Sequence, residues 1–396
     1  MRRDIVYFLT IFGFLLMVVW AKYYFFEHPA KGLSLLSASD IMIKAKEVLR
    51  KPTPVAYKES YIEYPVLTGI FMTVLALFSN SARDYFFLNG LTLSFFSTAS
   101  VFLARELARK AFGRKDPLII YLTPSLIFFT FFNWDSLALF FLLSALYLNL
   151  KGRHNLAILL SSLGFWFKIF PIFSAATILI NFLIEGKYRK FLKGLTVFLA
   201  ISLVLNLPFA LTFFKGWFVF FEFSSKRPPN IESFWNGLYL ISDKFFGRGL
   251  YWKIYYGLAI DFLSYSFFIF GSLIYFVQKW KRHLRMDLVI DVVFLVSVFL
   301  LTSKVYSPQY NIWVSLVFIM IGLNRIKIYL FEFFNLAIAW SIFEYFHLVF
   351  VKGISLLPFP LLKFTYSLAV LRHLVLFLLI VEIWRLAFDH RPYAEN

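Results

Sequence analysis

Between residues 155 and 184 the chain reads NLAILLSSLGFWFKIFPIFSAATILINFLI, an apolar run whose single charged side chain is Lys168. A bilayer core about 30 Å thick is crossed by about 20 residues of helix, so this run is too long for one span. Pro171 disfavours a continuous helix, and a lysine inside a bilayer needs water or an anion. The stretch therefore predicts two short membrane helices that meet near the outer surface at Lys168 and Pro171.

Composition places the whole chain in the same class. Of its 396 residues 60% are hydrophobic and only 16% are charged, and the mean hydropathy is +0.74. A soluble fold needs more polar surface than this to cover itself. Apolar runs recur from Ile5 to Phe388, without a polar stretch long enough for a separate globular unit. We therefore expect an all-α polytopic membrane protein with a single membrane-embedded domain, residues 1–396.

Positive charge predicts the orientation of the spans, because Lys and Arg gather in short cytoplasmic loops. Short basic clusters between apolar runs lie at residues 105–115, 151–153, 187–193, 279–285 and 325–327. They predict about twelve spans in the cell membrane, both termini in the cytoplasm, and two long outer loops, residues 22–84 and 213–253. This alternation requires that the run from Pro65 to Ser79 does not cross completely, so we expect an amphipathic or re-entrant helix there. The net charge of +18 then indicates contact with membrane lipids and not with nucleic acid.

Ionisable side chains beside a bilayer are costly, so those that persist are functional candidates. The predicted outer side collects them from separate segments, namely Asp40, Tyr61–Pro65, Asn133–Asp135, Lys168, Arg227 and Ser303–Tyr310. Structural alternatives are a solvated loop charge for Asp40 and Lys304, a helix-start carboxylate for Glu63 and Asp135, and interface packing for Gln309 and Tyr310. Lys168 has the weakest alternative, because snorkelling does not explain a lysine between two short helices.

Several kinds of site lack their sequence signature. The chain has no cysteine, and its six histidines show no His-x-x-x-His or Glu-x-x-His spacing, so neither a thiolate site nor a histidine metal site is indicated. It also has no Walker loop and no Gly-x-Gly-x-x-Gly, which argues against direct nucleotide hydrolysis. We predict no cofactor, and the sequence leaves the metal requirement open.

Motifs in the outer segments resemble those of one superfamily. Ser39-Asp40 after the first span, followed by Tyr61-Ile62-Glu63-Tyr64-Pro65, resembles the first outer loop of GT-C glycosyltransferases. Phe167-Lys168-Ile169-Phe170-Pro171 is similar to the Lys-Ile-Tyr-Pro element of the mannosyltransferase that adds the first mannose to GPI anchors. The turn from Ser303 to Trp313 is similar to a late turn of that enzyme and of the polyprenol-dependent mannosyltransferases of mycobacterial lipids, which the piece from Lys226 to Trp235 also resembles.

The resemblance implies a GT-C-like bundle that transfers a sugar, mannose in those relatives, from a polyprenyl-phosphate donor to a lipid-linked or glycan acceptor on the outer face. It implies that Asp40 is the catalytic base and that Glu63 is its partner or positions the acceptor. Tyr64 and Asp135 are then possible substrate-binding residues. Two departures bear on this: Val66 stands where a second proline is common, and no Asp-x-Asp surrounds Asp40, which weakens a metal-dependent reading.

The same resemblance implies how the donor is held. A leaving phosphate needs cations, for which Lys168 and Lys304 are the candidates, with Arg227 as a third. Gln309 and Tyr310 would line the donor pocket.

Two other classes stay open. A lipid-linked saccharide polymerase, ligase or flippase would share the many spans and the outer cations, but it would not require an acid just after the first helix. A secondary transporter is expected to have interrupted helices at the midplane and paired internal repeats, whereas the ionisable residues here cluster outside.

Overall fold

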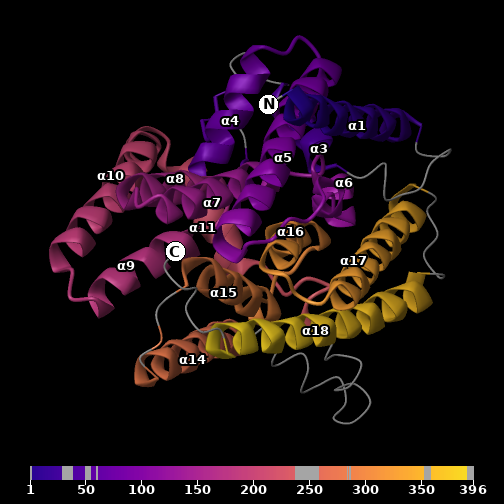
Figure 1. Cartoon of the computed structure of the whole chain (residues 1–396). Coiled ribbons are helices and arrows are strands. Elements are labelled where there is room, and N and C mark those ends of the chain that lie inside the picture. Colours follow the sequence, from indigo (N-terminus) through magenta and orange to yellow (C-terminus); the bar gives the residue numbers. More distant parts are fainter. Residues whose placement is uncertain are drawn as a thin grey trace. The chain divides into compact units, whose positions relative to one another are not determined.

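A computed structural model describes residues 2–28, 39–49, 55–58, 61–236, 258–282, 284, 287–351 and 358–389 (Figure 1). Helices make up the regular structure throughout these ranges, and no strand occurs in them. The helical class expected from the sequence is confirmed, and the apolar helices support a polytopic membrane protein. The chain divides into two compact units, Met1–Gly32 with Leu36–Arg227, and Leu33–Leu35 with Pro228–Asn396.

The described part of the first unit contains both long and short helices. They are α1 (Arg2–Glu27), α3 (Asp40–Val48), α4 (Val66–Leu77), α5 (Ala82–Phe112), η2 (Leu118–Tyr121), α6 (Pro124–Phe129), α7 (Asp135–Leu150), α8 (His154–Phe167), α9 (Ile172–Ile184), α10 (Tyr188–Thr212) and α11 (Phe214–Lys226). Local signals set several of their ends. Ser81 caps α5 by accepting a hydrogen bond from the Asp84 amide, and Gly113 ends it at a φ of 64°, which glycine adopts without strain.

The break predicted around Lys168 is confirmed. Helix α8 ends at Phe167, α9 begins at Ile172, and Lys168 lies between them in an extended conformation. At 14 and 13 residues these helices are each about 20 Å long. The Ser161 and Ser174 hydroxyls form a hydrogen bond that joins the two helices, so they pack as a hairpin instead of continuing as one helix.

Within the part of the chain that the structure describes, six helices are long and apolar enough to cross a membrane: α1, α5, α10, α14, α17 and α18. Six further apolar helices or helical segments have 10 to 17 residues, and among them is α4. With 12 residues α4 is about 18 Å long, which is too short for a complete crossing of a 30 Å core. This length agrees with the expectation for Pro65–Ser79, while the count of twelve spans and the orientation of the termini stay predictions.

The second unit contains α14 (Leu258–Lys281), α15 (Leu288–Thr302), η3 (Pro308–Asn311), α16 (Ile312–Ile321), α17 (Arg325–Phe346), η4 (His347–Val351) and α18 (Pro358–Asp389). Helices α17 and α18 pack along each other around Ile338, Ile342, Leu368 and Ala369 (Figure 1). An ion pair ties α14 to each end of α15. Lys279 lies 2.5 Å from Asp291 near the start of α15, and Lys304, just after its end, lies 2.6 Å from Asp261.

Candidate functional site

Asp40 is the first residue of the short helix α3, and its backbone is attached to the turn between α6 and α7. The Asp40 amide donates to the Phe132 carbonyl at 3.0 Å, and the Ser39 hydroxyl donates to the Phe131 carbonyl at 3.1 Å. Ser39 is buried and extended, so it serves as the start of the helix and as an anchor at once. The Ser39-Asp40 pair therefore fixes where the carboxylate lies.

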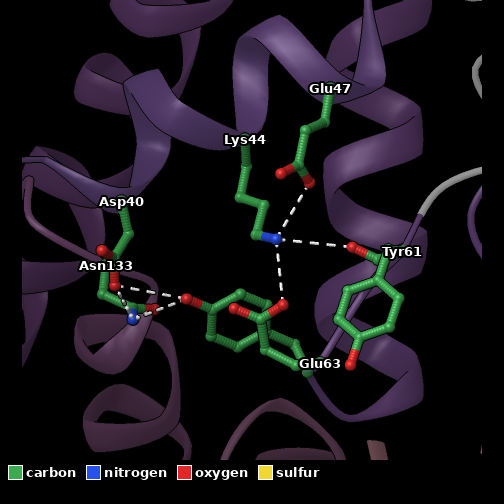
Figure 2. A network of polar contacts seen from close by, with 7 residues as sticks. Asp40, Lys44, Glu47, Tyr61, Glu63 and Asn133 are labelled. Atoms are coloured by element: carbon green, nitrogen blue, oxygen red, sulfur yellow. Dashed lines mark hydrogen bonds and ion pairs between the residues drawn. The ribbon is translucent and has the colours of Figure 1, made fainter. Parts of the chain in front are cut away.

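Two neutral donors bind the Asp40 carboxylate (Figure 2). Asn133 Nδ2 donates to Asp40 Oδ2 at 2.9 Å, and the Tyr64 hydroxyl donates to the same oxygen at 3.2 Å. Asn133 Nδ2 also lies 3.2 Å from the Tyr64 hydroxyl, and its Oδ1 accepts from the Trp134 amide, so the amide group has a fixed orientation. The Asp40 residue as a whole is partly buried.

The surroundings of Asp40 bring its pKa close to neutrality. Burial raises the pKa of the carboxyl to about 6, and the negative charges of Glu63 and Asp135 act in the same direction. The positive charge of Lys168 and the hydrogen bond from Tyr64 oppose this increase. A carboxyl with a pKa near 6 is ionised at neutral pH and still accepts a proton readily, which suits a general base.

Lys168 reaches the same cluster from the junction of α8 and α9. Its Nζ lies 3.7 Å from Asp135 Oδ1 and 4.8 Å from the centre of the Tyr64 ring, and both charged side chains are buried. The Thr68 hydroxyl of α4 donates to the Phe167 carbonyl at 2.8 Å, which fixes the end of α8. The first unit thus brings Asp40, Tyr64, Asp135 and Lys168 together, from segments 128 residues apart in the sequence.

The Glu63 side chain turns to α3 at a point one turn after Asp40. Its Oε2 forms an ion pair with Lys44 Nζ at 2.9 Å, and the same nitrogen lies 2.9 Å from Glu47 and 3.4 Å from the Tyr61 carbonyl oxygen (Figure 2). Lys44 was not a candidate in the sequence analysis. The sequence signal for Lys44 was its position on a short helix, four residues after Asp40 and three before Glu47, where helical side chains are neighbours.

Tyr57 is a second residue without a role assigned from the sequence. Its hydroxyl lies 2.8 Å from the Tyr64 carbonyl oxygen and 2.9 Å from that of Pro65. Its φ of 67° is unusual for a side chain with a Cβ, and its ring packs so closely on Gly69 that a Cβ there would lie 2.5 Å from the Tyr57 ring. Tyr57 therefore fixes the backbone of Tyr64 where α4 begins.

The other predicted donor residues lie in the second unit, except Arg227. Lys304 is buried and paired with Asp261, and its carbonyl accepts from the Asn230 amide at 2.9 Å. Gln309 is buried in η3, and Tyr310 stacks on Trp313 with ring centres 4.2 Å apart.

Arg227 ends the first unit at the end of α11. Its guanidinium lies over the Phe223 ring at 5.5 Å.

Arg372 of α18 holds the Lys304–Gln309 turn. It was not among the candidate residues of the sequence analysis. It is fully buried, with Nη1 2.7 Å from Asn335 Oδ1 and Nη2 2.9 Å from the Tyr306 carbonyl oxygen. Asn335 in turn donates to the Pro308 carbonyl at 2.8 Å. Because these acceptors include main-chain carbonyls, which every residue type carries, no residue pattern in the sequence predicts the contact.

A metal centre was left open by the sequence. Within the described ranges, no group of three or more His, Cys, Asp or Glu side chains is placed to hold a metal ion. Near Asp40, the position beside Glu63 is taken by the ammonium group of Lys44.

Comparison of the chain with protein-family models, with curated proteins and with solved structures finds no match. Function is therefore inferred from the two clusters of polar residues and from the motifs in the sequence.

Proposed function

We propose that the protein is a membrane glycosyltransferase that moves a sugar, mannose in the form we expect, from a polyprenyl-phosphate donor to a lipid-linked or glycan acceptor at the outer face. The observation that supports this most is the Asp40 carboxylate. It is held by Tyr64 and Asn133, and it lies in a cluster with the buried cation Lys168, in a segment that follows the first long helix.

In this proposal Asp40 is the base. The acceptor hydroxyl oxygen forms a bond to the anomeric carbon of the donor sugar while Asp40 takes the hydroxyl proton. The bond between the anomeric carbon and the phosphate oxygen breaks, and polyprenyl phosphate leaves with the electron pair. Tyr64 and Asn133 orient the carboxylate, so that one of its oxygens stays directed at the acceptor.

The proposed phosphate cations are Lys168 and Lys304. Each already has an aspartate partner, Asp135 for Lys168 and Asp261 for Lys304. In the absence of donor, the carboxylate keeps the buried ammonium group paired. An arriving phosphate would share the ammonium group with that carboxylate. Arg227, Gln309 and Tyr310 are the further residues that the motif resemblance assigns to donor binding.

The test is a screen of donors and acceptors with the purified protein in detergent, where no ion gradient exists. We expect transfer from a polyprenyl-phosphate sugar, detected as a mass increase of the acceptor, and loss of that transfer in Asp40→Asn. A flippase or a secondary transporter would leave every donor chemically intact. A polymerase or ligase would instead consume a lipid-linked oligosaccharide and transfer it as one piece.

A further inference from the structure

Asp40 and Lys44 lie one turn apart on α3 and face different neighbours. Asp40 contacts Asn133, beyond α6, whereas Lys44 contacts residues 61 to 63 (Figure 2). Lys44 is 6% exposed, so its ammonium group is stable only with acceptors around it. It has three: Glu47, Glu63 and the Tyr61 carbonyl. Three acceptors match the three N–H donors of an ammonium group, which leaves no donor for a substrate.

The segment from Tyr61 to Pro65 alternates like an extended strand. Ile62 and Tyr64 are buried, while the Glu63 side chain turns to Lys44. Lys44 thus holds the segment on the N-terminal side of Tyr64, at the Tyr61 carbonyl. Tyr57 holds it at the carbonyls of Tyr64 and Pro65. Between these two attachments the Tyr64 side chain projects to Asp40.

We propose that Lys44 is a positioning residue of the Asp40 site, and that Glu63 is the counter-ion of Lys44 and not a second base. Lys44 holds the Tyr61–Tyr64 segment against α3, so that the Tyr64 hydroxyl reaches the Asp40 carboxylate. It also neutralises Glu63, which otherwise adds an unpaired negative charge to the site. This inference rests on the proposed role of Asp40 in sugar transfer, but the contacts that carry it do not.

The proposal has a definite electrostatic consequence. The titratable groups that act on Asp40 are Lys168, Tyr64, Glu63 and Asp135, and Glu63 raises the pKa of Asp40. Loss of Lys44 leaves the Glu63 charge unpaired and releases Tyr64, so both changes move the pKa of Asp40 further upward. Loss of the Glu63 charge moves it downward.

The experiment follows the ionisation of Asp40 by two readouts. The first is labelling of the purified protein with a hydrophobic carbodiimide, which modifies protonated carboxyl groups, as a function of pH, with Asp40 quantified by peptide mass spectrometry. The second is the pH dependence of kcat/KM for sugar transfer. The variants are Lys44→Met, Lys44→Arg, Glu63→Gln and the double variant Lys44→Met/Glu63→Gln. Lys58→Met, at an exposed lysine of the same outer region, is the matched control.

In Lys44→Met we expect labelling to persist to a pH at least about 0.5 unit higher than in the wild type, a change of about threefold in the ionised fraction below the midpoint. Lys44→Arg should restore most of the difference, Glu63→Gln should lower the midpoint, and the double variant should lie between the two single ones. Lys58→Met should match the wild type. If Lys44→Met does not fold, Glu63→Gln and Lys44→Arg still decide the question, because each keeps a cation at position 44.

Other results would overturn the inference. If Glu63→Gln abolishes transfer and leaves the Asp40 midpoint in place, Glu63 is a second base. If Lys44→Met and Lys58→Met behave alike, or if Glu63→Gln raises the midpoint, Lys44 does not position the site. If the wild type transfers no sugar from any polyprenyl phosphate, the proposed function fails, while the labelling midpoints still test Lys44 independently.

Discussion

The Asp40→Asn substitution removes the proposed base and keeps almost everything else. An asparagine side chain has the size of the aspartate, and its carbonyl oxygen can still accept from Tyr64 and Asn133 at 3.2 and 2.9 Å. The backbone contact of residue 40 to Phe132 is unaffected, because it uses the amide. We therefore expect the variant to fold, insert and bind donor normally.

The stability of this variant follows from the direction of the pKa shift. Burial raises the pKa of Asp40 from 3.8 to about 6, so the folded protein binds its proton more tightly than the unfolded chain does. Stability contributed by this group is then present at low pH and is lost as the pH rises from about 4 to about 6. At pH 8 the ionised carboxylate costs about 2 to 3 kcal/mol of folding free energy. Asp40→Asn should therefore melt no lower than the wild type.

The transfer activity of Asp40→Asn, unlike its stability, should fall. General base catalysis contributes roughly a hundredfold to ten-thousandfold, so kcat should fall by at least about a hundredfold. The assay measures initial rates of sugar transfer, with donor binding and the melting temperature recorded on the same preparation. Near wild-type turnover in a folded variant would refute the role of Asp40 and direct attention to Glu63 or Asp135.

Four further expectations follow from the sequence and the structure. The kcat/KM of the wild type should rise with pH through about 6, because burial raises the pKa of Asp40 to that value and the base must be ionised; a profile flat from pH 5 to 7 would contradict this. Lys304→Met should lower kcat/KM by about ten- to a hundredfold, as charge-assisted contacts contribute roughly 1.5 to 3 kcal/mol, and Lys304→Arg should retain part of the activity, whereas a loop lysine would tolerate methionine. In intact cells a cysteine introduced by Lys110→Cys should be protected from an impermeant thiol reagent and one introduced by Arg227→Cys should react, since the chain has no native cysteine; labelling of both would contradict the predicted topology. Asp291→Asn should lower the melting temperature without changing donor KM, because it leaves the buried Lys279 2.5 Å from a neutral partner; an unchanged melting temperature would show that the pair is not stabilising.

Local signals explain which parts of the fold were predictable. Lys168 and Pro171 lie inside one apolar run. A charge and a proline there disrupt a helix whatever the tertiary fold of the rest of the chain. The helical class likewise followed from composition. The lengths of the helices were harder to predict, because six of the apolar segments form helices of 10 to 17 residues, shorter than the runs around them suggest.

The sequence drew attention to some residues of the Asp40 cluster but not to the contacts between them. Asp40 and Lys168 were candidates because each is an ionisable group beside an apolar run. Asn133 lies 93 positions from Asp40, and only tertiary packing makes it a ligand of that carboxylate. Lys44 and Arg372 looked like ordinary charges, because their acceptors include the main-chain carbonyls of Tyr61 and Tyr306, which every residue type carries.

The central claim, transfer of a sugar from a polyprenyl phosphate, is tested most directly by product stoichiometry. Purified protein would be mixed with a polyprenyl-phosphate sugar and an acceptor in a single turnover, without an ion gradient, and all lipid products would be quantified by mass spectrometry. We predict one polyprenyl phosphate released for each sugar that appears on the acceptor, with neither product formed by Asp40→Asn. Donor that stays intact while the wild-type protein is folded, or release of polyprenyl phosphate without glycosylated acceptor, would contradict it.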